Sequence, residues 1–471
     1  MEKEKGYTYM TDLTRDNPTK TLIKFSLPMV LSVVFQQFYN MADKLIAGRY
    51  AGEDALAAVS ASYPITMIIM AFALGTNIGC SVVISGLYGG KKYGEVKTAV
   101  STSVFLALCA GIVLSAISFF LSNPLLRLLQ TPDNIFADSA LYLRIYIYGF
   151  IFLYLYNICT GAFNALGNSR TPLYFLIASS VGNIILDYIF VAIFHWGVAG
   201  VGWATFIAQG ISSMLSLIAL IIEINKLKTD SKPPLLSASS LKKILVLAVP
   251  SILQQSFVSV GGLMIQGLVN GFGSSSIIAG YGVAIQLNTF AITVFNTSAN
   301  AVSNYTAQNI GSGNLERVRE GFRSALKIGF VIALPFVVLY AFFGNVMVSL
   351  FMDNPTAAAL QTGREFLLIV SPFYFTVMIK LSADGIMRGA SAVRYFVMST
   401  FSDLLLRVAL AYVLSPHFGT VGIWLSWPIG WVLSAILVVV FYIKGYWIHK
   451  DIRAEELKKF KANKKKSAAK A

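Results

Sequence analysis

Charged residues are scarce in this chain: 13% of its 471 residues are Asp, Glu, Lys or Arg, whereas 56% are hydrophobic. A soluble globular protein carries about 25% charged residues. The mean hydropathy of +0.67 agrees with this deficit. The composition therefore excludes an ordinary soluble domain and favours a protein that lies in a membrane.

Cysteine and histidine are also scarce, with three of each. Cys80, Cys109 and Cys159 all fall in apolar stretches, and this odd, scattered set supports neither a disulfide framework nor a zinc site. The histidines lie beside no nucleophile, and the glycines at 89–94 lack the Lys-Ser/Thr of a phosphate loop. We therefore expect no enzyme. We also expect no cleavable signal peptide, because residues 1–20 are polar.

Twelve apolar stretches are each long enough, at about 20 residues, to cross a bilayer as a helix. The sequence thus predicts an all-α polytopic membrane protein, with helix boundaries accurate to a few residues. The expected spans are 22–47, 56–86, 97–122, 139–162, 171–194, 199–223, 244–269, 277–308, 323–350, 362–386, 393–415 and 420–445.

The two halves of the chain are copies of one unit. Matching positions recur at an offset of 220–222 residues: Pro28 and Pro250, Gly90 and Gly311, Tyr174 and Tyr395, His195 and His417, and Gly202 and Gly422. This period is far too long for a solenoid repeat and indicates duplication of a helical bundle. Six spans per half place both copies in the same orientation, which predicts two six-helix lobes related by a parallel pseudo-two-fold axis.

The repeat and the loop composition together predict four segments. These are an N-lobe at 1–223, a cytoplasmic linker with Pro233-Pro234 at 224–243, a C-lobe at 244–445 and a basic cytoplasmic tail at 446–471. About half of the net charge of +15 lies from Lys444 onward. We expect this tail to contact anionic membrane lipid and no nucleic acid, since no nucleic-acid-binding fold accompanies the charge.

Basic residues alternate between successive connections, as they do where cytoplasmic loops collect Lys and Arg. They gather at 91–97, Arg170, 226–243, 317–327, and at Arg388 with Arg394, whereas the intervening connections hold chiefly Arg49 and Arg127. With twelve spans, this pattern predicts a multi-pass protein of the plasma (inner) membrane with both termini in the cytoplasm.

Several short motifs occur in a characteristic order. They are Pro28 with Asp43 and Gly48, Gly75-Thr-Asn-Ile-Gly79 leading to Gly89-Gly90-Lys-Lys-Tyr-Gly-Glu95, and Gly161-Ala-Phe-Asn-Ala-Leu-Gly167 with Pro172. With twelve spans in two lobes, the chain resembles the multidrug and toxic compound extrusion (MATE) transporters over roughly residues 20–445.

This resemblance implies a cation-coupled antiporter that exports organic cations and amphipathic drugs by alternating access. Inward flow of Na⁺ or H⁺ would drive export, and no cofactor other than that coupling ion is implied. We expect a monomer. A flippase for lipid-linked sugars or other amphipathic lipids is the alternative, because related flippases share the lobe architecture.

Acidic residues inside spans are costly and usually functional, and the first half has two, Asp43 and Asp187. Asn183 lies one turn before Asp187, on the same helix face. A rise of about 1.5 Å per residue places Asp187 and Thr205 roughly 15 and 12 Å below the external turn at Gly197, and Asp43 about 8 Å from Gly48. All four can therefore meet in the outer half of the first lobe.

Carboxylate, amide and hydroxyl oxygens suit Na⁺, and the carboxylates also accept a proton. The resemblance implies that Asp43, Asn183, Asp187 and Thr205 are the ligands of the coupling cation (Na⁺ or H⁺). The alternative is that Asn183 and Thr205 only form hydrogen bonds between helices. Lys44, which follows Asp43 where the family has small residues, either extends outward or pairs with an acid.

The second half departs from the first at the corresponding level. Asp403 and Arg407 align with Asn183 and Asp187, and Lys380 and Asp384 lie one turn apart on the tenth span. We interpret these four residues as compensated ion pairs. A role in substrate binding or proton relay is the alternative.

Polar and soft side chains in the spans are candidates for a substrate cavity, because uncharged polar groups should not face lipid. Aromatic and Met side chains also suit flat cations, although they often serve ordinary packing. The candidates are Gln36, Gln37, Asn40, Met67, Tyr142, Tyr146, Tyr154, Gln254, Gln255 and Gln286.

Overall fold

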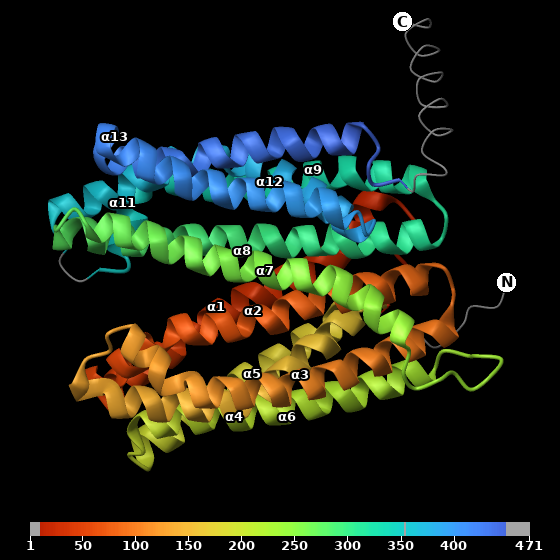
Figure 1. The fold of residues 1–471 in the computed structure, drawn as a ribbon, viewed down its shortest axis with the longest axis horizontal. Coiled ribbons are helices and arrows are strands. Elements are labelled where there is room, and N and C mark those ends of the chain that lie inside the picture. Colours follow the sequence, from red (N-terminus) through yellow and green to blue (C-terminus); the bar gives the residue numbers. More distant parts are fainter. Residues whose placement is uncertain (1–9, 353–354, 449–471) are drawn as a thin grey trace, which may run out of the picture. The chain divides into compact units, whose positions relative to one another are not determined.

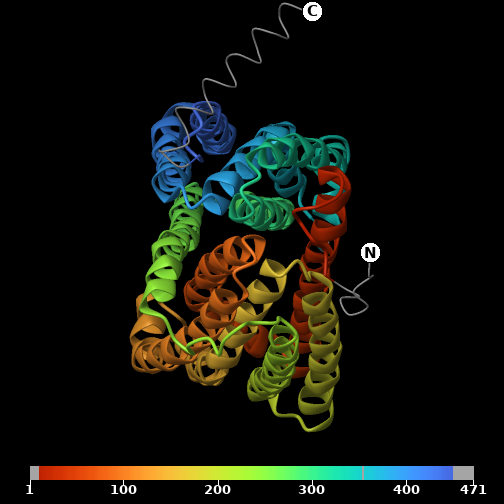
Figure 2. The ribbon, with the colours of Figure 1, turned by 90° about the vertical axis from the view of Figure 1, so that its right-hand side faces the viewer.

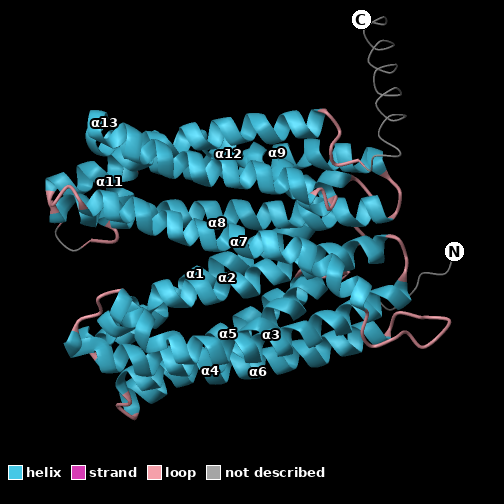
Figure 3. Ribbon diagram, viewed as in Figure 1, coloured by secondary structure: helices cyan, strands magenta, loops and turns pink. Residues whose placement is uncertain are grey.

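The computed structural model describes residues 10–352 and 355–448, and within these ranges the regular elements are helices joined by loops (Figure 3). In the first half they are α1 (Pro18–Ile46), the π-helix η1 (Ala47–Ala51), α2 (Glu53–Gly89), α3 (Tyr93–Leu128), α4 (Asp133–Ala165), α5 (Arg170–Asp187), the π-helix η2 (Tyr188–Ile193) and α6 (Gly197–Asn225). In the second half they are α7 (Ala238–Asn270), α8 (Ser275–Gly311), α9 (Leu315–Phe342), α10 (Gly344–Ser349), α11 (Ala357–Val370), the 3₁₀ helix η3 (Ser371–Phe373), α12 (Tyr374–Gly389) and α13 (Val393–Ile443). The predicted tail beyond residue 448 and the side chain of Lys44 lie outside the described part.

The membrane-spanning prediction is confirmed. Eleven continuous helical segments of the described chain are long and apolar enough to cross a bilayer. The last, α13, contains both the eleventh and the twelfth predicted spans, and its backbone is non-helical at Gly419 (φ 59°, ψ −139°). Twelve spans therefore fit the structure, because one of its eleven segments is two helices meeting at a kink.

Contacts divide the chain into two units. The first contains residues up to Asp16 and Ile23–Val260, and the second contains Asn17–Leu22 and the residues from Gly261 onward. The long helices of each unit run side by side along their length in Figure 1, and Figure 2 shows most of them end-on. Each unit is thus a bundle of long helices.

Two pairs of repeat-related turns have the same unusual backbone. Gly52 and Gly273, which precede α2 and α8, have φ of 93° and 68°. Gly197 and Gly419, at the turns before the last helix of each half, have φ of 55° and 59°. Positive φ costs glycine little, whereas most other residues adopt it rarely. The repeat seen in the sequence is therefore a repeat of local backbone structure as well.

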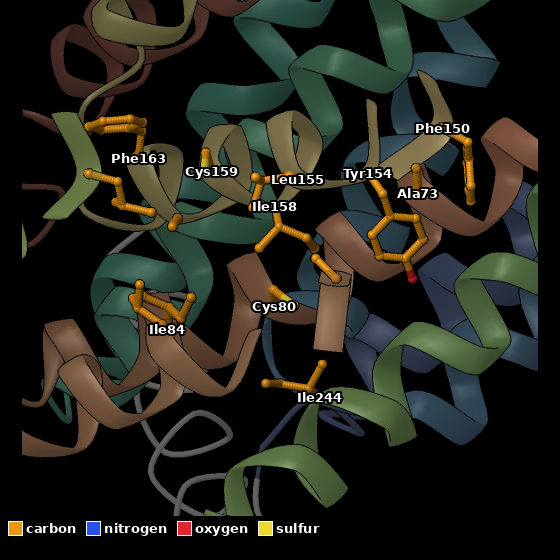
Figure 4. Close-up of a cluster of buried hydrophobic side chains, with 14 of the residues drawn as sticks. Ala73, Cys80, Ile84, Phe150, Tyr154, Leu155, Ile158, Cys159, Phe163 and Ile244 are labelled. Atoms are coloured by element: carbon orange, nitrogen blue, oxygen red, sulfur yellow. The ribbon is translucent and has the colours of Figure 1, made fainter. Parts of the chain in front are cut away.

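The core of the first unit lies between α2 and α4 (Figure 4). Cys80 and Ile84 from α2 pack with Ile158 and Phe163 from α4, and Ile244 from α7 joins the same cluster. Tyr154 also belongs here, since its hydroxyl lies 2.6 Å from the Thr76 hydroxyl and its side chain is only 2% exposed. Tyr154 is thus part of the packed core of the first unit, and its role in substrate binding stays a prediction.

Glycine allows α7 to approach α2 closely. A Cβ atom on Gly79 would lie 2.8 Å from the backbone nitrogen of Ala248 and 2.8 Å from the carbonyl oxygen of Ile244. By contrast, Cβ atoms on Gly182 and Gly262 would meet no atom within 4 Å. Close helix packing therefore accounts for Gly79 but not for every glycine in the spans.

The connection between α6 and α7 is fastened to α3. The Thr98 hydroxyl donates to the carbonyl oxygen of Pro234 over 2.7 Å, and the Ser237 N–H donates to the Thr102 hydroxyl over 3.2 Å. The Ser101 hydroxyl makes a further bond to Leu235. The polar face at the start of α3 thus holds this connection in place.

Candidate functional site

The end of α5 places two polar side chains inside the first unit. Asn183 and Asp187 lie one turn apart and are 2% and 0% exposed. The π-helix η2 follows at once, and the chain then turns back through His195 and Gly197, both at positive φ. Helix α6 therefore returns alongside α5 and brings Thr205 to the level of Asn183.

The Asn183 amide joins α5 to α6. With its NH₂ group toward Asp187, it donates to Asp187 Oδ2 over 2.9 Å, and its carbonyl oxygen accepts from the Thr205 N–H over 3.1 Å. The opposite orientation offers one longer contact, 3.4 Å from the NH₂ group to the Thr205 hydroxyl. The first orientation satisfies both ends of the amide and fixes the position of the Asp187 carboxyl group.

Helix α1 contributes the second acid. The carboxyl group of Asp43 lies within hydrogen-bonding reach of that of Asp187. The π-helix η1 after α1 packs against α2, α6 and η2, and the rings of Tyr50 and Tyr188 meet edge to face at 5.7 Å. Two carboxyl groups attract each other only when a proton or another cation lies between them. This pair is therefore suited to hold one.

Two tyrosine hydroxyl groups complete the surroundings of the acids. The Tyr39 hydroxyl, one turn before Asp43, lies near the Thr205 side chain and close to both acids. Tyr142 from α4 also lies near both carboxyl groups. We predicted Tyr142 only for a substrate cavity and did not predict Tyr39. The spacing of four residues between Tyr39 and Asp43 was the signal available in the sequence, since residues so spaced share a helix face.

A cavity of about 30 Å³ lies between α4 and α6, beside this cluster. Thr205 and Gln209 form one wall, and Tyr146, Gly149 and Leu153 form part of the other. A buried water needs about 10–15 Å³ measured in this way. The cavity thus has room for about two water molecules next to the Thr205 side chain.

The other cavity candidates are distributed over five helices. On α1, Gln36 and Asn40 are exposed and Gln37 is half-buried. Met67 on α2, Tyr146 on α4, and Gln254 and Gln255 on α7 are half-buried, while Gln286 on α8 is exposed. None of these side chains is fully enclosed within its own unit, and their role in substrate binding stays a prediction.

The second unit contains a buried ionic network. Lys380 Nζ lies 3.1 Å from Asp384 Oδ2 and 3.3 Å from Asp403 Oδ2, and Arg407 Nη2 lies 3.0 Å from Asp403 Oδ2. Asp384 and Asp403 are 3% and 5% exposed. The four residues that the sequence interpretation grouped as ion pairs are therefore in direct contact.

Arg388 departs from its predicted place. The sequence pattern predicts it in a cytoplasmic connection, but it lies in the last turn of α12 and is 5% exposed. Its Nη2 donates to Asn300 Oδ1 over 2.8 Å, and its guanidinium carbon lies 5.5 Å from the centre of the Phe396 ring. Only Arg394 of this pair is an exposed charge.

Comparison with known proteins places the chain in a family. The family model MatE matches residues 28–189 and again 250–413, so the two matches start at the repeat-related prolines. A relative described as "Probable multidrug resistance protein YpnP" of Bacillus subtilis (strain 168) is 30% identical, over 93% of this chain and 97% of its own length. Another, "Probable multidrug resistance protein YoeA" of the same organism, is 28% identical over 92% and 95%.

Solved structures agree with the fold. One, described as "Outward-facing conformation of a multidrug resistance MATE family transporter of the MOP superfamily", has a TM-score of 0.86 at 23% identity, covering 94% of this chain and 98% of that one. A MOP superfamily transporter from Pyrococcus furiosus has a TM-score of 0.85 at 23% identity with the same coverage. The double family match and the full-length relatives show that the chain belongs to the MatE family and is a multi-pass membrane transporter, not an enzyme.

Proposed function

We propose that this transporter is a cation-coupled antiporter that exports organic cations and amphipathic drugs by alternating access. The observation that carries the proposal is the contact between Asp43 on α1 and the fully buried Asp187 on α5. The names of its relatives as multidrug resistance proteins support the substrate class.

The coupling ion is Na⁺ or H⁺, held by Asp43, Asn183, Asp187 and Thr205. Either ion would neutralise part of the charge of the two acids and so strengthen the contact of α1 with α5 and α6. An ion that binds one conformation better shifts the population toward it by its difference in affinity. A drug that prefers the other conformation is then released as the ion binds.

The remaining features are proposed from the sequence pattern. Both termini lie in the cytoplasm, the membrane is the plasma (inner) membrane, the protein works as a monomer without a resident cofactor, and the lobes are 1–223 and 244–445. Small cationic or amphipathic molecules and membrane lipid are its partners. The basic residues after Lys444 act as an anchor at the cytoplasmic lipid surface.

Efflux of a fluorescent cationic dye from proteoliposomes tests the proposal. A sodium gradient and a proton gradient are imposed separately on vesicles that contain the purified protein. We expect at least one gradient to drive dye transport, and the response identifies the ion. If dye transport is independent of both gradients and the protein scrambles a labelled lipid-linked sugar, the flippase alternative would instead be established.

A further inference from the structure

The ionic network of the second unit occupies the place that corresponds to the candidate cation site of the first. Asp403 and Arg407 lie 220 residues after Asn183 and Asp187 and are also one turn apart. Trp427 lies eight residues after the positive-φ Gly419, as Thr205 lies eight residues after the positive-φ Gly197. The two sets are therefore repeat-related by sequence and by local backbone.

The chemistry of the two sets differs in one respect. The groups around Asp187 are the carboxyl group of Asp43 and the amide of Asn183, with tyrosine hydroxyls nearby. The groups around Asp403 are the ammonium of Lys380 at 3.3 Å and the guanidinium of Arg407 at 3.0 Å. Lys380 also reaches Asp384 at 3.1 Å, so its ammonium lies between two carboxylates. The Lys380 ammonium therefore occupies the position in which a free cation would bridge the carboxylates of Asp384 and Asp403.

Side chains of the protein provide the positive charge of this network. Lys380 and Arg407 balance the charges of Asp384 and Asp403. Arg388, which is buried and interacts electrostatically with Asp384, adds a third positive charge. The guanidinium carbon of Arg407 lies 4.3 Å from the centre of the Trp427 ring, a favourable cation–π distance. An additional cation would enter a buried set that already has an excess of positive charge, which is costly.

We propose that Lys380 is a tethered cation that fills the second unit's counterpart of the coupling site and excludes alkali-metal ions from it. The transporter then has one site for a mobile ion, in the first unit. This last consequence rests on the proposed function, whereas the exclusion of ions by Lys380 does not. Asp384 Oδ1 and Asp403 Oδ1 are buried and accept no hydrogen bond from the described residues, so these oxygens are available to a metal cation once the ammonium is removed.

Thermal unfolding of the purified full chain in detergent tests the proposal. The probes are sodium chloride and potassium chloride, compared with choline chloride at constant ionic strength. In Asp187→Asn, which disables the first-unit site, we expect no difference in Tm between these salts. In Asp187→Asn/Lys380→Ala, we expect a saturable rise of about 2 °C or more with at least one alkali-metal ion. Adding Asp384→Asn should remove the rise, since it removes a ligand.

Two outcomes would overturn the proposal. One is a folded Asp187→Asn/Lys380→Ala variant with no alkali-metal response. The other is a response already present in Asp187→Asn that Asp384→Asn abolishes, because the second unit would then bind free cations despite Lys380. If variants with Lys380→Ala fail to fold, the comparison of Asp187→Asn with and without Asp384→Asn tests the proposal alone. Dye efflux by Asp187→Asn tests the proposed function separately. The rise in Tm with alkali-metal ions in Asp187→Asn/Lys380→Ala does not depend on the result of that efflux experiment.

Discussion

The carboxyl groups of Asp43 in α1 and Asp187 in α5, 144 residues apart in the sequence, lie within hydrogen-bonding reach of each other inside the first unit. The Asn183 amide fixes Asp187 from the same helix and reaches α6 at Thr205. Three helices thus converge on one acidic pair. Any change in the charge of that pair acts on all three.

Thr205 offers a test of this convergence that leaves the acids intact. Thr205→Val keeps the shape of the side chain but removes the hydroxyl that lies near Tyr39 and the acids. Loss of one hydrogen bond is worth about 1 kcal/mol, and we expect the apparent affinity of the coupling ion to fall about fivefold to tenfold. The concentration of ion that gives half-maximal dye efflux measures this. Thr205→Ser, which keeps the hydroxyl, should behave as wild type, and equal losses in both variants would contradict the role of the hydroxyl.

The ionic network of the second unit predicts a stability effect. Arg407→Leu leaves Asp403 with one partner fewer in a buried site, and removal of one member of such a pair costs about 3–5 kcal/mol. We expect a clear drop in Tm. The double variant Asp403→Asn/Arg407→Leu retains the Lys380–Asp384 pair and should recover most of it. A stable Arg407→Leu protein that has lost coupled transport would show that the network works in transport instead.

Much of the fold follows from the sequence, because membrane spans need long apolar stretches and a duplication repeats them. The division of α13 at Gly419 was also predictable, from the repeat of His195-Trp-Gly as His417-Phe-Gly. The burial of Arg388 was not. Its position near a helix end matches a cytoplasmic loop charge, and only the contact with Asn300 on α8 distinguishes it.

The candidate site could be predicted only in part. The spacing of Asn183 and Asp187 and the hairpin at Gly197 were sufficient to bring these residues near Thr205. The orientation of the Asn183 amide depends on how α5 and α6 are rotated against each other, which periodicity does not determine. The same limit applies to the glycines, since a Cβ atom on Gly79 would collide with α7, whereas one on Gly182 would meet no atom within 4 Å.

Gly79 provides a packing prediction. Gly79→Ala places a methyl group 2.8 Å from the backbone of α7 and should destabilise the protein by about 1–3 kcal/mol, measured as a lower Tm. Gly262→Ala is the matched control, because it meets no atom within 4 Å and replaces glycine by a better helix former. The close approach of α2 and α7 would be contradicted if both variants changed Tm equally.

Topology is tested by labelling single cysteines in a background without Cys80, Cys109 and Cys159. Ser275, at the start of α8, and Ser239, at the start of α7, are both exposed. We expect Ser275→Cys to react with an impermeant maleimide added outside intact cells. Ser239→Cys should react only after the cytoplasmic side is opened. The reverse pattern would overturn the orientation that the basic loops predict.

The most direct test of the central claim is gradient-driven dye efflux by Asp43→Asn, Asp187→Asn and the double variant in proteoliposomes. If the acids form one coupling site, each single variant should lose at least about tenfold in rate, and the double variant should lose no more, since residues that act as a unit are not additive. Asp138→Asn, at an exposed position on α4, should match wild type. Efflux at the wild-type rate by either single variant would contradict the account and place the coupling site elsewhere.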